Sequence, residues 1–328
     1  MDADTGRLAW KTQVPVEGGP GPMALDPRKD FLYVGNRNSQ RLASYRIERR
    51  TGNLSLVGDV PLQGEPVAME MDRTGRFILS AHFYQSTAAV HAVDADGVIV
   101  FPPVEWRYTH YGAHGIQVDR SNRFLFVPHV ARNGGPNAVA QFRFDDTTGR
   151  ITPNTPPFLH LKEYVGPRHM ASHPSLDVLY SSDEQGASVT AYHLDPSGGT
   201  LANFQTISTV PEGFTPADEI NCSQLKVSPD GRFLFVITRG HNSIASFTID
   251  PATGALAAAG RVPTEPDARP LCLDPEGRFA VAAGGGMSKY GRLATYRIDQ
   301  ASGQLTPLET YDGGNGPMWI LITRLDEG

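Results

Sequence analysis

The sequence predicts an all-β fold, a β-propeller with seven blades. Three observations predict it. The chain repeats with a period of about 45 to 55 residues. It holds 34 glycines and 26 prolines in 328 residues, which favours short strands joined by tight turns over helices. Its apolar segments alternate with a period of two, as strands packed on at least one face do.

Each repeat contains the same elements in the same order: an apolar strand ending in Asp-Pro or a related turn, an aromatic-led strand, an alternating strand, a glycine turn and a leucine-led fourth strand. Four short strands make one small sheet, which buries both faces only by stacking against its neighbours around an axis. The first strands are expected at residues 23–27, 116–119, 225–229 and 271–275; the second begin at Phe31, Phe77, Phe124, Phe233 and Phe279; the third are expected at residues 42–47, 139–144, 189–194, 244–249 and 293–298.

Seven glycines occupy the turn before the fourth strand, where a tight hairpin often needs a positive φ. They are Gly6, Gly52, Gly97, Gly149, Gly198 or Gly199, Gly254 and Gly303. Six repeats are complete, from about Gly18 to about Tyr311.

The closing blade is expected to be shared between the two ends of the chain. Residues 316–322 read as its first strand and residues 8–14 as its fourth, whereas its two middle strands are absent from the sequence. Either the chain is truncated at its start or this blade is reduced. We expect one propeller domain spanning residues 1–328.

Composition narrows the classes of function. The formal net charge is −6 with a pI of about 5.9, which does not favour a nucleic acid as partner. No apolar window is long enough for a membrane helix, and the acidic N-terminus is not a secretory signal. Cys222 and Cys272 suit two buried thiols in a reducing compartment. We therefore expect a cytoplasmic protein, a monomer or weak homodimer.

Polar residues gather where strands of successive repeats begin or end. Arg168 and His169 stand at the start of a first strand, and His114 occupies the matching position one repeat earlier. Glu184 follows the second strand of the same repeat as Arg168, and Arg239 occupies its matching loop one repeat later. A propeller brings such positions to one mouth of its channel, so we expect His114, Arg168, Glu184 and Arg239 to form one pocket, with His169 and His82 as further substrate-binding residues, His82 at the rim.

This set suits acid–base chemistry on an anionic substrate. An arginine fork binds carboxylate or phosphate and stabilises an oxyanion, while a histidine or carboxylate activates water. No Gly-x-Ser-x-Gly motif marks a serine nucleophile and no Cys/His spacing marks zinc, so we expect neither a metal nor a cofactor.

The ordered motifs resemble the propeller-type lactonases, the bacterial 6-phosphogluconolactonase group, which is related to the carboxy-cis,cis-muconate cyclases. The motifs are Gly166-Pro167-Arg168-His169-Met170, Pro211-Glu212-Gly213-Phe214, Ser228-Pro229-Asp230-Gly231-Arg232-Phe233-Leu234, Arg239-Gly240-His241-Asn242-Ser243-Ile244 and Gly316-Pro317-Met318-Trp319. The resemblance implies a seven-bladed propeller of carbohydrate metabolism, in the pentose phosphate pathway.

The resemblance also implies a site of one histidine, two arginines and one glutamate, which fall on His114, Arg168, Glu184 and Arg239. Gln224 stands where the family often has an acidic residue, and is expected to bind substrate. The preceding loop contains Asp218 and Glu219, one of which could replace the lost charge.

Three functions remain open from the sequence. The leading one is hydrolysis of a sugar lactone, 6-phosphogluconolactone above all. A muconate-type lactonizing cycloisomerase would use the same arginines for its carboxylates. A non-catalytic propeller that binds a partner on its flat face would not need the four groups close together.

Overall fold

The computed structural model describes residues 1–214, 220–285 and 290–325. Within these residues the protein consists of six four-stranded antiparallel sheets, and its only helix is the short 3-10 turn Arg132–Gly134. No helix in the described part of the chain is long and apolar enough to cross a membrane.

The chain divides into two compact units, each with three sheets. The N-terminal unit comprises Thr12–Lys162, Asp195–Thr200 and Arg324–Gly328; the C-terminal unit comprises Met1–Lys11, Glu163–Leu194 and Leu201–Thr323. In every sheet the strands pair in sequence order, so each sheet is a simple meander, or blade.

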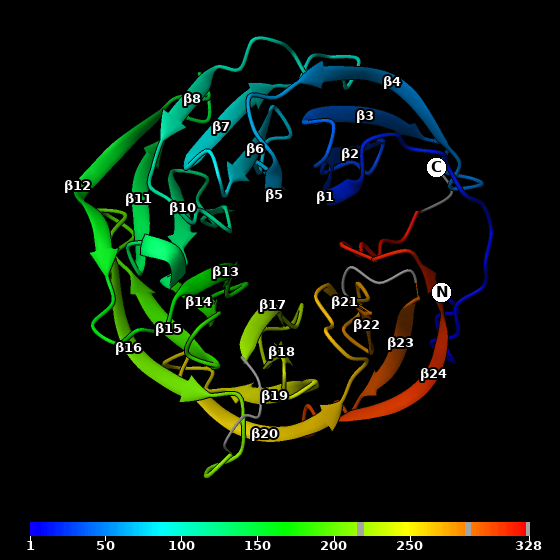
Figure 1. The fold of residues 1–328 in the computed structure, drawn as a ribbon, viewed down its shortest axis with the longest axis vertical. Coiled ribbons are helices and arrows are strands. Elements are labelled where there is room, and N and C mark those ends of the chain that lie inside the picture. The colour runs from blue at the N-terminus through cyan, green and yellow to red at the C-terminus, as the bar shows by residue number, and fades with distance from the viewer. Residues whose placement is uncertain (215–219, 286–289, 326–328) are drawn as a thin grey trace. The chain divides into compact units, whose positions relative to one another are not determined.

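The three blades of the N-terminal unit hold twelve strands, of which β1 and β5 are neighbours (Figure 1). The strands are β1 Pro20–Leu25, β2 Phe31–Asn36, β3 Arg41–Ile47, β4 Leu54–Pro61, β5 Pro66–Met71, β6 Phe77–His82, β7 Thr87–Ala92, β8 Glu105–Tyr108, β9 Gln117–Val118, β10 Phe124–His129, β11 Ala138–Phe144 and β12 Ile151–His160.

The C-terminal unit repeats this plan, with its first strands β13, β17 and β21 side by side. Its strands are β13 Pro167–Ser172, β14 Val178–Asp183, β15 Ser188–Leu194, β16 Leu201–Ser208, β17 Asn221–Val227, β18 Phe233–Arg239, β19 Ser243–Ile249, β20 Leu256–Pro263, β21 Leu271–Leu273, β22 Phe279–Gly284, β23 Gly291–Ile298 and β24 Leu305–Gly314.

The second strand of five blades begins at the phenylalanine that the repeat predicts: Phe31, Phe77, Phe124, Phe233 and Phe279. In each case the phenylalanine N–H donates to a side-chain oxygen five residues earlier, at 2.6–3.0 Å. The acceptors are Asp26, Asp72, Asp119, Ser228 and Asp274. A side-chain acceptor at this place satisfies a donor that the turn would otherwise leave unpaired, which explains why Asp or Ser ends the first strand.

The predicted turn glycines all have a positive φ, and Gly199 rather than Gly198 is the one in the left-handed region. Six of them also press against the first large side chain of the second strand in the preceding blade. A Cβ on Gly97 would lie 2.4 Å from the Phe31 ring, and one on Gly149 would lie 2.5 Å from the Phe77 ring. Glycine is therefore required twice, by backbone conformation and by the approach of one blade to the next.

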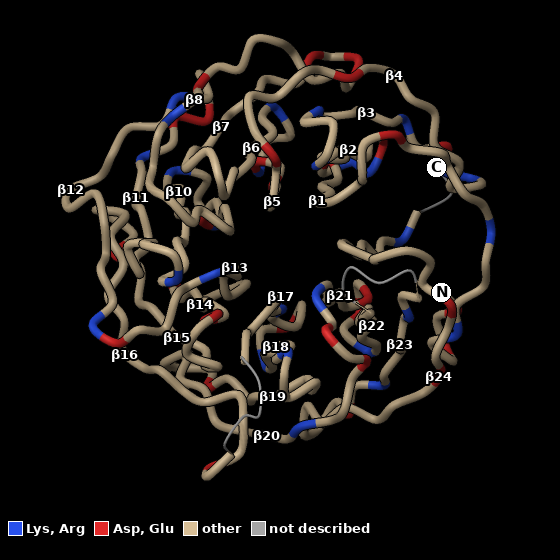
Figure 2. The backbone as a smooth tube through the Cα atoms, viewed as in Figure 1, with Lys and Arg blue, Asp and Glu red and all other residues tan. Residues whose placement is uncertain are grey.

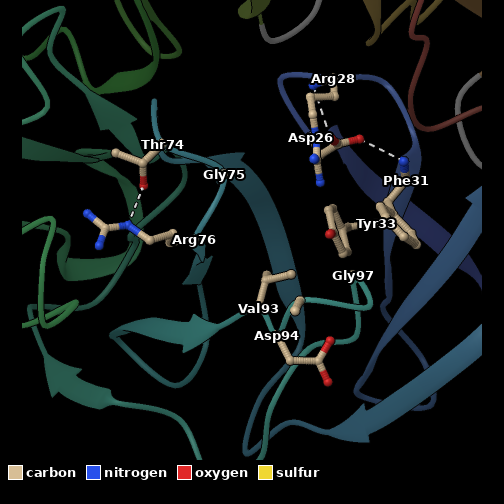
Figure 3. Close-up of a pocket in the computed structure, with 11 residues that line it drawn as sticks. Asp26, Arg28, Phe31, Tyr33, Thr74, Gly75, Arg76, Val93, Asp94 and Gly97 are labelled. Atoms are coloured by element: carbon tan, nitrogen blue, oxygen red, sulfur yellow. Dashed lines mark hydrogen bonds and ion pairs between the residues drawn. The ribbon is translucent and has the colours of Figure 1, made fainter.

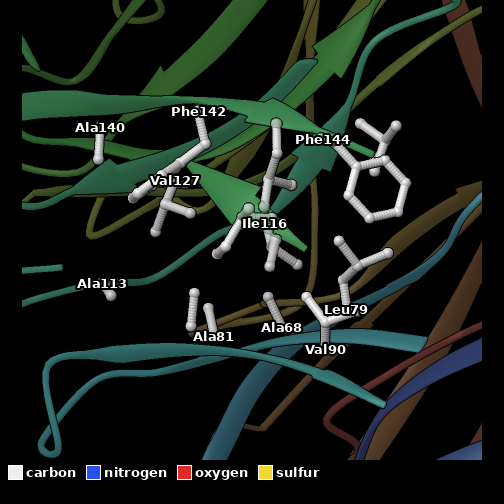
Figure 4. Close-up of a cluster of buried hydrophobic side chains, with 14 of the residues drawn as sticks. Ala68, Leu79, Ala81, Val90, Ala113, Ile116, Val127, Ala140, Phe142 and Phe144 are labelled. Carbon is white, nitrogen blue, oxygen red and sulfur yellow. The ribbon is translucent and has the colours of Figure 1, made fainter. Parts of the chain in front are cut away.

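The core consists of apolar side chains between stacked blades. In Figure 4, side chains of the second and third blades interdigitate, among them Leu79, Val90, Val127 and Phe142. The Phe77 and Phe144 rings meet edge to face, with centroids 6.0 Å apart. This is the face-to-face packing that a propeller requires.

The two terminal segments differ from our expectation, because neither residues 8–14 nor residues 316–322 form a strand. A strand persists where it has hydrogen-bonded neighbours, and neither segment pairs with a described strand. Gly52 differs from the other turn glycines in its surroundings. Its only close described neighbour is Leu325, at 3.8 Å from a Cβ, where the other turn glycines meet a side chain of the preceding blade within 3 Å.

We predict that Gly149→Ala destabilises the protein by about 2–4 kcal/mol. The substitution forces a side chain into a left-handed conformation and against the Phe77 ring. Gly134→Ala is the matched control, because Gly134 has φ +85° but no atom within 4 Å of a Cβ, and should cost about 1 kcal/mol. Urea denaturation measures both. Equal losses would show that the contact with Phe77 contributes nothing.

Three histidines of the N-terminal unit are wholly buried: His82, His91 and His129. His82 Nε2 lies 3.0 Å from Ser80 Oγ, and His129 Nε2 lies 3.0 Å from Thr109 Oγ1. Neither ring nitrogen of His91 hydrogen-bonds to a described residue. Desolvation lowers the pKa of His82 and of His129 to about 3, and that of His91 to about 4. All three are therefore neutral in the folded protein at neutral pH.

These histidines should make the fold less stable in acid. Below about pH 6.5 their side chains are protonated in the unfolded chain but stay neutral in the folded chain. The contribution of these histidines to the free energy of unfolding is fully present above that pH and is lost as the pH falls toward their folded pKa. For His91 the loss between pH 7 and pH 4 is about 3 kcal/mol. We predict that His91→Phe loses that much less than the wild type, measured by urea denaturation at a series of pH values. Parallel pH curves would contradict the prediction.

Candidate active site

The C-terminal unit brings together three of the predicted residues, each at an end of a strand. Arg168 is the second residue of β13, Glu184 directly follows β14, and Arg239 is the last residue of β18. Backbone hydrogen bonds fix Glu184 between neighbouring elements: its N–H donates to Gly166 O at 2.7 Å, and its carbonyl accepts from Cys222 N at 3.3 Å.

One buried carboxylate holds both arginines. Glu184 Oε2 lies 3.5 Å from Arg168 Nε, and Glu184 Oε1 lies 3.1 Å from Arg239 Nη2. The Glu184 side chain is 1% exposed, whereas those of Arg168 and Arg239 are 9% and 12% exposed. The carboxylate is thus buried more deeply than the two guanidinium groups that pair with it. This arrangement presents a fixed pair of cationic forks to an anion.

The cluster continues through two residues that the sequence alone did not single out. Asp267 Oδ1 lies 3.8 Å from Arg239 Nη1, and Asp267 Oδ2 lies 3.3 Å from Arg269 Nη2. Cations and carboxylates therefore alternate from Arg168 to Arg269. Charges are also interspersed elsewhere in each unit, without a continuous block of one sign (Figure 2). Asp267 lies in a loop of the next blade, outside the strand-end positions that the repeat aligned, which explains why it was missed.

Asp183, the residue before Glu184, is buried in a nest of hydroxyl groups. Its carboxylate accepts from Ser181 Oγ, Ser188 Oγ and Thr190 Oγ1 at 2.7–2.8 Å. Desolvation raises the pKa of Asp183 to about 6, although the hydroxyl donors oppose the rise. The hydroxyl donors fix the last residue of β14 and so support the position of Glu184 beyond it.

His169 lies beside the arginines and is half-buried. Its ring meets that of Trp319 edge to face, with centroids 6.1 Å apart. Desolvation, together with the positive charges of Arg168, Lys226 and Arg239, lowers the pKa of His169 well below its usual range. His169 is therefore neutral near neutral pH, and it can donate or accept a hydrogen bond but cannot serve as a cationic group there.

Gln224 is buried in β17 and its side chain has a structural partner. Its Oε1 accepts from Leu271 N at 3.0 Å, which ties β17 to β21 of the next blade. An acidic residue at this place would accept the same hydrogen bond. The substrate-binding role we expected for Gln224 stays a prediction. Asp218 and Glu219, the other candidates for the missing charge, lie outside the described residues.

The remaining two predicted residues belong to the N-terminal unit. His114 precedes β9, donates its N–H to Pro128 O at 3.0 Å, and places its ring 5.5 Å from that of Phe83. His82 was expected at a rim, and this placement is wrong, since its exposed fraction is 0%. The repeat explains the difference: counted from the start of the second strand, His82 corresponds to buried Asp183, and Phe83 corresponds to Glu184. A shift of one residue reverses the side of a strand.

Both cysteines, Cys222 and Cys272, are buried free thiols, as expected. Burial raises the pKa of Cys222 to about 11, so this thiol is protonated at neutral pH. In the described part of the chain, no three residues of the His, Cys, Asp and Glu types lie close enough to hold a metal ion.

A separate cavity of about 310 Å³ lies in the N-terminal unit, at the end of the strands away from His114 (Figure 3). Asp26, Arg28, Tyr33, Arg76 and Asp94 line it. The buried Tyr33 hydroxyl makes no hydrogen bond to a described residue, whereas Tyr180, at the same position of its strand, donates to Gly254 O at 2.8 Å. The turn of the second blade is one residue shorter here, which opens the cavity. It does not hold the predicted catalytic groups.

The stacked four-stranded antiparallel blades place this chain in the class of β-propeller proteins. More particularly, this chain belongs to the lactonase family of seven-bladed β-propellers, whose family model matches residues 1–322. It is 33% identical over 323 residues to a 6-phosphogluconolactonase of Pectobacterium carotovorum, with 98% of this chain and 93% of the relative covered. A 6-phosphogluconolactonase of Erwinia tasmaniensis is 33% identical over 321 residues, with the same coverage.

The fold is also similar to that of a solved periplasmic gluconolactonase from Pseudomonas aeruginosa. The TM-score is 0.85 at 24% identity, covering 96% of this chain and 91% of the other. At this identity the likeness supports the fold.

Proposed function

We propose that this protein is a lactonase that hydrolyses 6-phosphogluconolactone to 6-phosphogluconate. The observation that carries the proposal is the pair Arg168 and Arg239, which one buried carboxylate holds side by side. Membership of the lactonase family and the names of the relatives at 33% identity support the same reaction.

The arginine pair supplies what lactone hydrolysis needs. Water attacks the carbonyl carbon, and the carbonyl oxygen becomes an oxyanion in the tetrahedral intermediate. Donors that are already in place stabilise this charge without reorganising, because Glu184 fixes the guanidinium groups before substrate binds. The ring C–O bond then breaks, the ring oxygen takes a proton to become a hydroxyl, and the carbonyl carbon becomes a carboxylate. The sum is lactone plus water giving a hydroxy carboxylate and one proton.

The attacking water must lose a proton, and two groups were candidates for accepting it. Each oxygen of Glu184 already faces an arginine, so this residue suits a positioning role. We therefore propose His114 as the base, since an imidazole is a common acceptor of the proton of an attacking water. The substrate-binding role that we expected for His82 stays a prediction.

We further propose that the chain forms one propeller domain, 1–328, with an incomplete seventh blade to which both terminal segments contribute. The family's description as seven-bladed supports this arrangement. We also propose a cytoplasmic location, supported by the two free thiols, and a monomer or weak homodimer in solution.

We predict that the protein hydrolyses 6-phosphogluconolactone faster than unphosphorylated gluconolactone and does not cyclise carboxymuconate. A panel of the three substrates, followed by alkali titration of the acid released or by loss of the muconate absorbance, measures this. Cyclisation without lactone hydrolysis would establish the muconate-type reaction instead. Inactivity on all three would favour a binding module.

We predict that Arg168→Ala lowers kcat/KM for the lactone by about 10²–10³-fold, the usual effect of removing one oxyanion donor. Arg232→Ala is the control, because Arg232 is half-exposed at the opposite end of its blade, paired with Asp230 at 2.7 Å. Thermal melting checks that both variants fold. Unchanged kinetics of a folded Arg168→Ala variant would overturn the assignment.

A further inference from the structure

Lys226 is a cation of the C-terminal unit to which neither the reaction nor the fold assigns a partner. It is half-buried near the end of β17. Its side chain forms no ion pair, hydrogen bond or ring contact with any described residue. Every other charged group named in the cluster has an ion-pair partner: Arg168 and Arg239 pair with Glu184, and Arg269 pairs with Asp267. A partly desolvated ammonium without a counter-ion favours an anionic ligand.

The repeat explains why Lys226 has no partner among the described residues. In each blade one residue of the first strand lies opposite the third residue of the second strand. In the C-terminal unit these residues are Ala171, Lys226 and Cys272, opposite Tyr180, Phe235 and Val281. Because β13, β17 and β21 are neighbours, Lys226 is flanked at its own level by an alanine and a buried neutral thiol.

The N-terminal unit gives an internal comparison at the same level. Glu70 of β5, opposite the third residue of β6, is the charged residue there. Its carboxylate accepts from Gln117 Nε2 at 2.9 Å and from Val118 N at 2.7 Å, and Arg73 pairs with it at 3.4 Å. Glu70 is therefore paired with groups of the protein itself, whereas no described residue pairs with the Lys226 side chain.

The positive charge of Lys226 also acts on the same residue as the charges of the two site arginines. The positive charges of Arg168, Lys226 and Arg239 all act on His169. Arg168 stands three residues before Ala171 in β13, which corresponds to about 10 Å along the strand. A second cationic point at this separation, with neutral His169 between, fits a substrate that carries its reacting carbonyl at one end and an anionic group at the other.

From this we propose that Lys226 binds the phosphate group of the lactone and determines the preference for a phosphorylated substrate. The inference rests on the proposed function and deepens it, since the arginines then face the carbonyl and Lys226 faces the far end. The chain of ion pairs holds three arginines against two carboxylates, Glu184 and Asp267, and Lys226 adds a positive charge that pairs with neither. A phosphate dianion would balance this excess, and a compact ammonium suits phosphate as a point charge.

The test compares kcat/KM for phosphorylated and unphosphorylated gluconolactone in Lys226→Met, Lys226→Arg and the wild type. We expect Lys226→Met to lower kcat/KM for the phosphorylated lactone about 10–100-fold, mainly through KM, and to leave the unphosphorylated lactone unchanged. Lys226→Arg keeps the charge and should retain most of the preference. Lys11→Met is the control, because Lys11 is exposed in the same unit. Equal loss on both lactones, or no loss on either, overturns the proposal.

A second measurement separates this proposal from the proposed function. Inorganic phosphate is titrated against the wild type and both Lys226 variants by calorimetry, a readout that needs no turnover. If the wild type hydrolyses neither lactone, the proposed function fails, and phosphate binding that weakens in Lys226→Met still supports the subsite. Phosphate binding that is absent in the wild type, or unchanged in Lys226→Met, overturns it. Should Lys226→Met not fold, Lys226→Gln takes its place in both measurements.

Discussion

The contact between a turn glycine and the first large side chain of the preceding blade is the constraint on which the rest of this structure depends. The glycine allows the left-handed turn that starts the fourth strand, and its lack of a Cβ lets a phenylalanine of the neighbouring blade approach. An aspartate or serine five residues earlier fixes that phenylalanine by accepting its N–H. Local turn chemistry and packing between blades are thereby coupled in the same few residues, which is why the repeat is so visible in the sequence.

This rigid framework holds a cluster of buried charged side chains in place. Removing two arginines and a glutamate from water is costly, and apolar residues of similar shape would often serve stability as well or better. The cluster persists because rigid strand ends hold each guanidinium against one oxygen of Glu184. A buried carboxylate that holds two arginines side by side is better explained by the binding of an anion than by the demands of the fold.

Much of this fold follows from the sequence because its signals are local. Each signal lies within one repeat: a glycine that allows a positive φ, a side-chain acceptor five residues before a strand, and a period of two. The structure has the predicted second and third strands where these residue patterns placed them. The closing blade could not be settled in the same way. Whether residues 8–14 pair as a strand depends on partners elsewhere in the chain, and a strand pattern does not contain that information.

The site was predictable where it coincides with the repeat and not where it departs from it. Glu184 and Arg239 lie at equivalent ends of second strands and Arg168 lies at the start of a first strand, so counting along the repeat brought them together. The same counting placed His82 one residue out of register, where the alternation of side chains turns a rim position into a buried one. Asp267 and Lys226 were missed for another reason. Their significance lies in which charges are paired and which are left over, and only the three-dimensional arrangement of all the partners decides that.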